Sequence, residues 1–279
     1  MFINIYFLEK VMVKLIPREI KEANWPEARE LNNEEQQNYG SAVAGFTSKT
    51  ARDILGKEST LFRILLLNKI GIRTGTIPEL DLLWHNTPNF IKGHYCDSRE
   101  VVLRSAEDPY KPNVQIAKDL AKLAEVHTLT TPLILKGLIP VETDDENYAQ
   151  YCMRLDRGDN FEVIPAPDFS FKNDRRKLKA INPDYTIEWC EAEEEGTRTF
   201  YAKNGGVSWV CLRDSNVDSD WSDFDDSSSS GRVVVVDAEG VVPKNLSNYM
   251  NRLKEQKAAQ IAEIEARYQK ACNLMYGKK

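Results

Sequence analysis

From residue 99 onwards, short apolar and β-branched segments alternate with turns rich in Gly, Asn, Asp and Pro. This texture predicts strands, because β-branched and aromatic side chains suit an extended backbone and the turn residues interrupt it. Several gaps are longer than a tight hairpin, so long loops are expected. The predicted strands lie at 99–105, 131–141, 152–155, 161–167, 185–189, 197–202, 207–212 and 232–236.

Few helices are predicted beside these strands. One runs from an N-cap at Ser48 to Gly56, and a second is capped by Ser59 and ends at Gly71. A third spans 113–127, where apolar residues recur at helical spacing. The chain is therefore expected to fold as an α+β protein with short strands, few helices and long loops.

A long helix is predicted over 244–279, with apolar residues three and four apart. Its apolar pattern is clean for only about two heptads, fewer than a coiled coil needs. Packing against the chain's own domain and helix-mediated oligomerisation both remain open.

Three parts are expected along the chain. Residues 1–89 form a mixed helical and loop segment that packs on the main domain, 90–242 form a ligand-binding domain, and 243–279 form the C-terminal helix. The first seventeen residues lack the basic region and cleavage site of a signal peptide and predict a buried strand, although translation starting at Met12 is an alternative to Met1.

Composition argues against several classes of protein. The formal net charge is -6, whereas nucleic-acid-binding proteins usually carry a basic excess. No apolar run approaches the ~20 residues that cross a bilayer. The five cysteines form no CxxC pair, so neither a disulfide framework nor a zinc site is indicated. A cytoplasmic or virion-associated location is expected, and no cofactor.

Residues 207–230 differ most from the rest of the chain. Ser and Asp dominate the segment, and Lys, Glu, Gln and Met are absent from it. An acidic, serine-rich linker is one interpretation, although Trp209, Trp221 and Phe224 are unusual in a linker. A calcium-binding loop is another, since oxygen ligands are supplied by Asp218, Asp220, Asp223, Asp225 and Asp226, without the spacing of an EF-hand. The third is a binding surface on a rigid scaffold, where aromatic anchors stand among small polar residues.

The same segment carries a resemblance to a known family. Gly206 and Ser208 open it, Ser219 and Trp221 form a Ser-x-Trp in its middle, and a Gly-Arg-Val-Val-Val-Val run closes it at 231–236. This pattern is similar to the variable region, here about 205–236, of proteins diversified by diversity-generating retroelements in archaeal viruses, nano-sized archaea and related bacteria. GHYCDSREVVLRS (93–105), PNVQIAKDLAKL (112–123) and FEVIPAPDFSFKNDRRKL (161–178) resemble the family's framework. The resemblance covers about 90–240.

The resemblance implies a C-type lectin fold of the formylglycine-generating-enzyme type and a hypervariable ligand-binding face. It also implies that Asn codons are mutated at adenines, which reaches Asp, Ser, Tyr and Gly but never Lys, Glu, Gln, Met or Trp. The tryptophans would then be constant scaffold residues. The family's variable region commonly ends the chain, so the helix predicted after it is a departure.

The function expected from these features is non-enzymatic recognition of a partner through exposed side chains at 208–230. The expected partner is a protein on a cell or virus surface. Trp209, Phe224 and 233–236 are expected in the core. A calcium-dependent carbohydrate-binding lectin is the alternative. No catalytic constellation is visible around the three histidines, and the basic run 172–179 is expected to be a solvated loop. The candidate ligand-binding residues are Arg213, Asp214, Asn216, Asp218, Asp220, Trp221, Ser222, Asp223, Asp225, Asp226, Ser228, Ser229 and Ser230.

Overall fold

A nine-stranded mixed sheet organises the part of the chain that the structure, a computed structural model, describes: residues 39–57, 59–86, 92–126, 128–171, 176–191, 197–228 and 230–234. The strands are β1 (Tyr95–Leu103), β2 (Leu133–Glu142), β3 (Met153–Pro165), β4 (Arg176–Ile181), β5 (Ile187–Cys190), β6 (Arg198–Ala202), β7 (Val207–Arg213), β8 (Asn216–Ser219) and β9 (Gly231–Arg232). Their order is β3-β2-β1-β7-β8-β6-β4-β5, and β9 pairs with β1.

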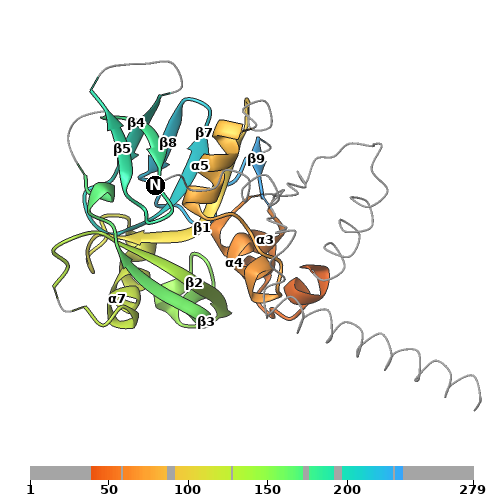
Figure 1. Cartoon of the computed structure of the whole chain (residues 1–279). Coiled ribbons are helices and arrows are strands. Elements are labelled where there is room, and N and C mark those ends of the chain that lie inside the picture. The colour runs from red at the N-terminus through yellow and green to blue at the C-terminus, as the bar shows by residue number, and fades with distance from the viewer. Residues whose placement is uncertain are drawn as a thin grey trace, which may run out of the picture. The chain divides into compact units, whose positions relative to one another are not determined.

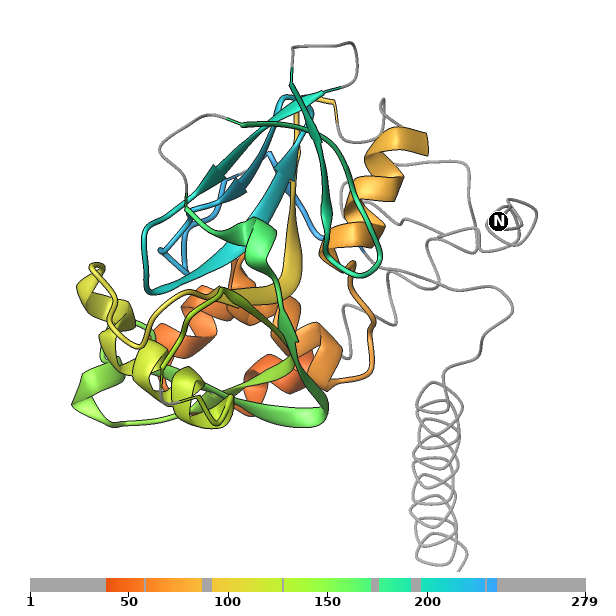
Figure 2. The ribbon, with the colours of Figure 1, turned by 60° about the vertical axis from the view of Figure 1, so that its left-hand side comes forward.

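Strand β1 joins the two halves of the sheet. It pairs antiparallel with β2 on one side and with β7 on the other, and parallel with β9. Figures 1 and 2 show β1 running between the β2–β3 pair and the group formed by β4 to β8. β8 pairs antiparallel with β7 and parallel with β6. A mixed sheet with few helices confirms the predicted α+β class.

The helices and 3-10 turns with described bounds are α3 (Lys49–Gly56), α4 (Leu61–Lys69), α5 (Ile77–Asn86), α7 (Val114–Leu123), η1 (Lys111–Asn113), η2 (Glu146–Tyr148) and η3 (Pro167–Phe169). Residues 39–44 are also helical. Ser48 caps α3 as predicted, because its hydroxyl accepts a hydrogen bond from Ala51 N. The cap of α4 is Thr60 and not the predicted Ser59. Helix α4 packs on β1 and β2, α5 on β4, and α7 on β3. No helix in these residues is long and apolar enough to cross a membrane.

One hydrophobic core connects the helices to the sheet. Every residue of α4 from Leu61 to Leu67 is buried, so this helix lies inside the fold and not on its surface. Its side chains belong to the same buried cluster as residues of α7, of β1 to β3 and of β7. Figure 2 shows α3 and α4, in orange, beside the β2–β3 pair. The structure therefore places α3 and α4 in one core with the strands that follow, whereas α5 lies outside this cluster and packs on β4.

Several predicted elements need correction. The strands expected at 152–155 and 161–167 are one strand, β3, and part of the basic run 172–179 forms β4 where a solvated loop was predicted. Strand β8 lies within the segment expected to be a loop, and α5 was not predicted. The N-terminal strand, the helix at 244–279 and the assignments of Met1 or Met12 lie outside the described residues.

Two glycines explain the continuous β3. Gly137 of β2 has a φ of 68°, and a Cβ there would lie 2.2 Å from Asn160 O of β3. A Cβ on Gly158 would in turn lie 2.7 Å from Gly137 O. The strands approach closely at this bulge, which lies between Lys136 and Leu138. The Gly-Asp-Asn sequence at 158–160, between the two predicted strands, is therefore a bulge within one continuous strand.

Gly137→Ala should destabilise the protein strongly, because alanine adds both a positive-φ penalty and a clash with backbone of β3. We expect a loss of at least about 2 kcal/mol in the free energy of unfolding, measured by urea denaturation. Gly56→Ala is the control, since a Cβ there meets nothing within 4 Å. Equal midpoints for the two variants would contradict the close approach.

Candidate functional site

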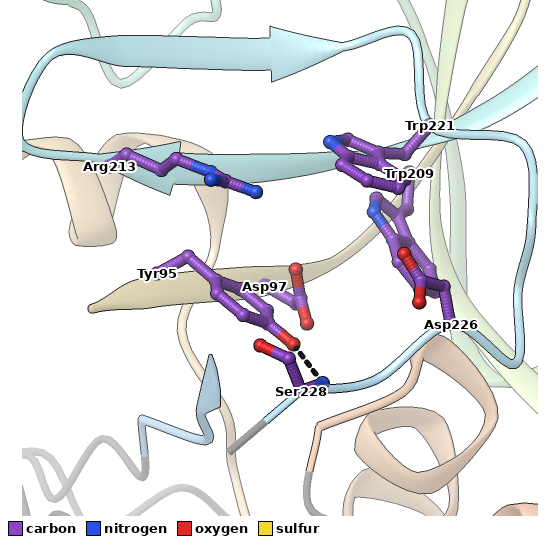
Figure 3. A pocket seen from close by; sticks show the side chains of 7 residues that line it. All are labelled: Tyr95, Asp97, Trp209, Arg213, Trp221, Asp226 and Ser228. Atoms are coloured by element: carbon purple, nitrogen blue, oxygen red, sulfur yellow. Dashed lines mark hydrogen bonds between the residues drawn. The ribbon is translucent and has the colours of Figure 1, made fainter. Parts of the chain in front are cut away.

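A pocket of about 190 Å³ lies where β1, β7 and the segment after β8 meet. Four of its lining residues belong to the predicted site and three do not. Figure 3 shows side chains from these elements pointing towards one another around the hollow. The lining residues are Tyr95, Asp97, Trp209, Arg213, Trp221, Asp226 and Ser228.

Asp97 of β1 forms the buried floor of this pocket. Its side chain is only 1% exposed, and the Ser59 hydroxyl donates a hydrogen bond of 2.5 Å to Oδ2. Oδ1 has no hydrogen-bond partner among the described residues. Burial raises the pKa of Asp97 to about 7, against the lowering effects of the Ser59 hydroxyl, the Cys211 thiol and Arg213. A carboxyl group that changes charge near neutral pH therefore faces the pocket.

Aromatic residues anchor the segment after β8. Phe224 is fully buried and stacks on Trp209 and on Tyr151, with ring centroids 6.2 and 6.1 Å away. The backbone of Trp209 donates to Trp221 O, and the Trp221 ring packs partly buried on the core. The prediction that Trp209 and Phe224 lie in the core is confirmed. Val233 and Val234 are also buried, whereas 235–236 lie outside the described residues.

Arg213 stands at the wall of the pocket with its charge already matched. Its Nε lies 3.4 Å from Asp218 Oδ2, and its guanidinium lies over the rings of Tyr95 at 5.4 Å and Trp221 at 6.0 Å. Asn216 donates to Asp218 Oδ1 at 2.8 Å. The guanidinium is thus held by one carboxylate and two aromatic faces.

Asp218 corrects one prediction. It was expected to be exposed, but it is only 7% exposed, because β8 pairs with β7 and sets Asp218 opposite Cys211. Burial raises the pKa of Asp218 to about 6, with a further increase from the charge of Asp220 and a decrease from Arg213. Asp218 is therefore part of the framework that positions Arg213.

The other predicted residues spread around the pocket at different depths. Asp225 bonds to Lys57, and the backbone of Ser228 donates to the Tyr95 hydroxyl at 2.9 Å. The exposed residues are Asp214, Asp220, Asp226 and Ser228. Those of intermediate burial are Arg213, Asn216, Trp221, Ser222, Asp223, Asp225 and Ser230. Ser229 lies outside the described residues.

A buried arginine clamps both ends of the β7–β8 unit. Arg104 donates to Ser208 Oγ at 2.7 Å, to Ser219 Oγ at 2.6 Å and to Phe169 O at 2.9 Å. Burial lowers the pKa of Arg104 to about 9. Ser208 and Ser219 are fully buried, so they are not available to a ligand. The serines that open and centre the segment thus serve as framework.

Lys203 and Asn113 hold the same segment from behind. Lys203 Nζ donates to Ser222 Oγ at 2.8 Å and to Asp108 Oδ1 at 3.0 Å, and Asn113 Nδ2 donates to Ser222 O. The Asp108 carboxylate lies so close to Gly206 that a Cβ there would be 2.2 Å from Oδ2. Asn113 is the N-cap residue of α7, but its side chain makes no cap hydrogen bond.

A second, more open hollow of about 410 Å³ includes Arg104 and Lys203 in its lining. Both cations already donate to framework groups at several positions. The hollow thus has no comparable unpartnered group. This hollow is therefore a weaker candidate for a ligand site than the pocket around Asp97.

Sequence reasoning missed the framework residues Tyr95, Asp97, Arg104 and Lys203. The first three lie in the 93–105 run that carries the family resemblance, but no local pattern assigned them a role. The structure brings them to the segment from more than 100 residues away. Among the described residues, no group of three or more His, Cys, Asp or Glu side chains is arranged to hold a metal ion.

The burial of the aromatic rings predicts an order among three variants in the free energy of unfolding. Phe224→Ala should lower the free energy of unfolding by about 3–5 kcal/mol, as expected for a buried aromatic. Trp221→Ala should cost about 1–3 kcal/mol, and exposed Asp226→Ala less than about 0.5 kcal/mol. Urea unfolding of the three variants measures the order. Equal values would show that the segment is not anchored by these rings.

The buried carboxyl group of Asp97 predicts that the free energy of unfolding depends on pH. The folded pKa of Asp97 lies above its ordinary value, so between that value and about 7 the folded state binds the extra proton and stability falls as pH rises. Asp97→Asn removes this loss. The variant should therefore gain about 2 kcal/mol relative to the wild type between pH 5 and pH 8. Denaturation at both pH values measures it, with exposed Asp144→Asn as control; a pH-independent difference would refute it.

Comparison of the chain with protein-family models, with curated proteins and with solved structures gave no match. The functional assignment therefore depends on the pocket, on the residues around it and on the resemblance of the segment.

Proposed function

We propose that the chain is a non-enzymatic ligand-binding protein of receptor or adhesin type, whose hypervariable surface at 208–230 recognises a protein partner. The proposal includes a C-type lectin-like scaffold, which the resemblance implies. A mixed sheet with few helices and long loops is compatible with that scaffold.

One observation carries the proposal: within a single segment, framework and surface residues separate cleanly. Ser208, Trp209, Ser219 and Phe224 are buried and bonded or stacked to distant elements. Between and after them lie small polar residues that reach solvent, and Asp214, Asp220, Asp226 and Ser228 are exposed. Exposed substitutions away from special features usually change stability by less than about 0.5 kcal/mol. Such a segment tolerates changes in its surface while its fold is held from behind.

The chemistry of the surface supports a basic or hydrogen-bond-rich partner. The exposed groups are carboxylates and hydroxyls, the half-buried Trp221 stands beside them, and the buried rings of Trp209 and Tyr95 line the pocket. Aromatic residues beside small polar ones are typical of adaptable protein-recognition surfaces. The calcium-dependent lectin alternative has weaker support, because the one deeply buried aspartate of the segment, Asp218, is already paired with Arg213.

Sequencing of this gene across many isolates tests the proposal. Substitutions should concentrate at the codons of exposed and half-buried residues between Asp214 and Ser230, chiefly at adenines, with a near-identical template copy beside a reverse transcriptase. Ser208, Trp209, Ser219, Phe224 and the half-buried Trp221 should stay constant. Variation spread evenly over the gene, or none in this segment, would refute a hypervariable surface.

A further inference from the structure

The floor of the Asp97 pocket has two polar atoms without partners. Asp97 Oδ1 and Trp209 Nε1 make no hydrogen bond with any described residue, although their side chains are only 1% and 2% exposed. A buried polar group without a partner costs roughly 1–3 kcal/mol. Native proteins therefore keep few such groups, and each calls for a group that completes it. In Figure 3 the Asp97 carboxylate points into the space between Arg213 and the two indole rings.

The charges around this space leave an excess of carboxylate. Arg213 is matched by Asp218 at 3.4 Å. Asp226 lines the pocket and forms no ion pair with a lysine or arginine of the described chain. Beyond the larger effect of burial, the charge of Asp226 raises the pKa of Asp97, and the charge of Arg213 opposes it. A positive charge in the pocket would relieve this repulsion.

The walls favour the same charge. Trp209, Trp221 and Tyr95 line the pocket, and aromatic faces attract cations most strongly when water is excluded. The arrangement already holds one organic cation, the Arg213 guanidinium, over Tyr95 and Trp221. The volume of about 190 Å³ suits one side-chain group, since a cavity of about 150 Å³ holds a benzene ring.

We propose that the pocket is a subsite for the terminal cation of one basic side chain, lysine or arginine, presented by the protein partner. The cation donates to Asp97 Oδ1 and to the Asp226 carboxylate and lies against the indole rings. Its remaining N–H bonds to a water molecule, which also accepts from Trp209 Nε1. Asp97 and Trp209 are framework residues, so the floor of the subsite is constant, whereas Asp226 belongs to the variable rim. This inference rests on the proposed binding function and names the chemistry of the partner.

The subsite couples binding to the charge of Asp97. A cation favours the ionised carboxyl, so affinity rises with pH through about 7, the pKa of Asp97 in the empty pocket. The groups that face Asp97 and share in its titration come from four places in the fold: Ser59 before α4, Tyr95 and Cys96 on β1, Cys211 and Arg213 on β7, and Asp226.

The test uses n-butylammonium as the probe and the indole N–H signals of the full chain in NMR titrations. Saturable shifts of the Trp209 and Trp221 signals are expected at pH 8, with at least fivefold weaker binding at pH 6. Asp97→Asn should weaken binding at pH 8 at least tenfold and remove its pH dependence, and Asp226→Asn should weaken it severalfold. Exposed Asp144→Asn is the matched control and should bind as the wild type does.

Further probes separate the possible ligands. Tighter binding of methylguanidinium than of n-butylammonium would show that the pocket prefers arginine. Tighter binding of n-butylammonium would show that it prefers lysine. The neutral 1-butanol should bind at least tenfold more weakly. Equal binding of 1-butanol, no saturable shift up to about 100 mM probe, or unchanged affinity in Asp97→Asn overturns the proposal. If the gene segment varies among isolates but the pocket binds no cation, only this inference is refuted. If the segment does not vary, the proposed function is refuted.

Discussion

The candidate site depends on the hydrogen bonds that the buried guanidinium of Arg104 donates. This group bonds to Ser208 near the start of β7 and to Ser219 at the end of β8, and it reaches Phe169 O outside that unit. Removing a charge from water is costly, and only several well-placed acceptors offset the cost. With its donors distributed over three segments, Arg104 fixes the positions of the two ends of β7–β8 relative to β1. The pocket lies directly on this unit.

The site has a rigid interior and a polar rim. The interior consists of the stacked rings of Trp209, Phe224 and Tyr151, together with Asp218, which holds the half-buried Arg213 at the wall. The rim consists of short side chains that make few contacts with the core. This division explains how one short segment combines tolerance of substitution with a defined pocket. Asp97 occupies the boundary between them, since it is buried in the core and still faces the hollow.

Some of this organisation was readable from the sequence. Local propensity and hydrophobic pattern predict the α+β class with its many strands, and they predict the cap at Ser48. They also place Trp209 and Phe224 in the core. The structure confirms these predictions. The unusual composition of 207–230 distinguishes the segment that lines the pocket from the rest of the chain. The C-type lectin scaffold and the binding role remain proposals, supported by the resemblance and by the geometry of the site.

The amino-acid sequence by itself determined the local elements and the chemical character of the segment, because these depend on side chains a few residues apart. Tertiary structure decided which residues meet. Asp97 receives its hydrogen bond from Ser59, 38 residues earlier, and Lys57 reaches Asp225 across 168 residues. Asp218 looked like any other aspartate of the segment, yet pairing of β8 with β7 and β6 buried it beside Arg213. Strand pairing and burial are long-range properties, so no local pattern distinguishes a carboxylate on the rim from one in the floor.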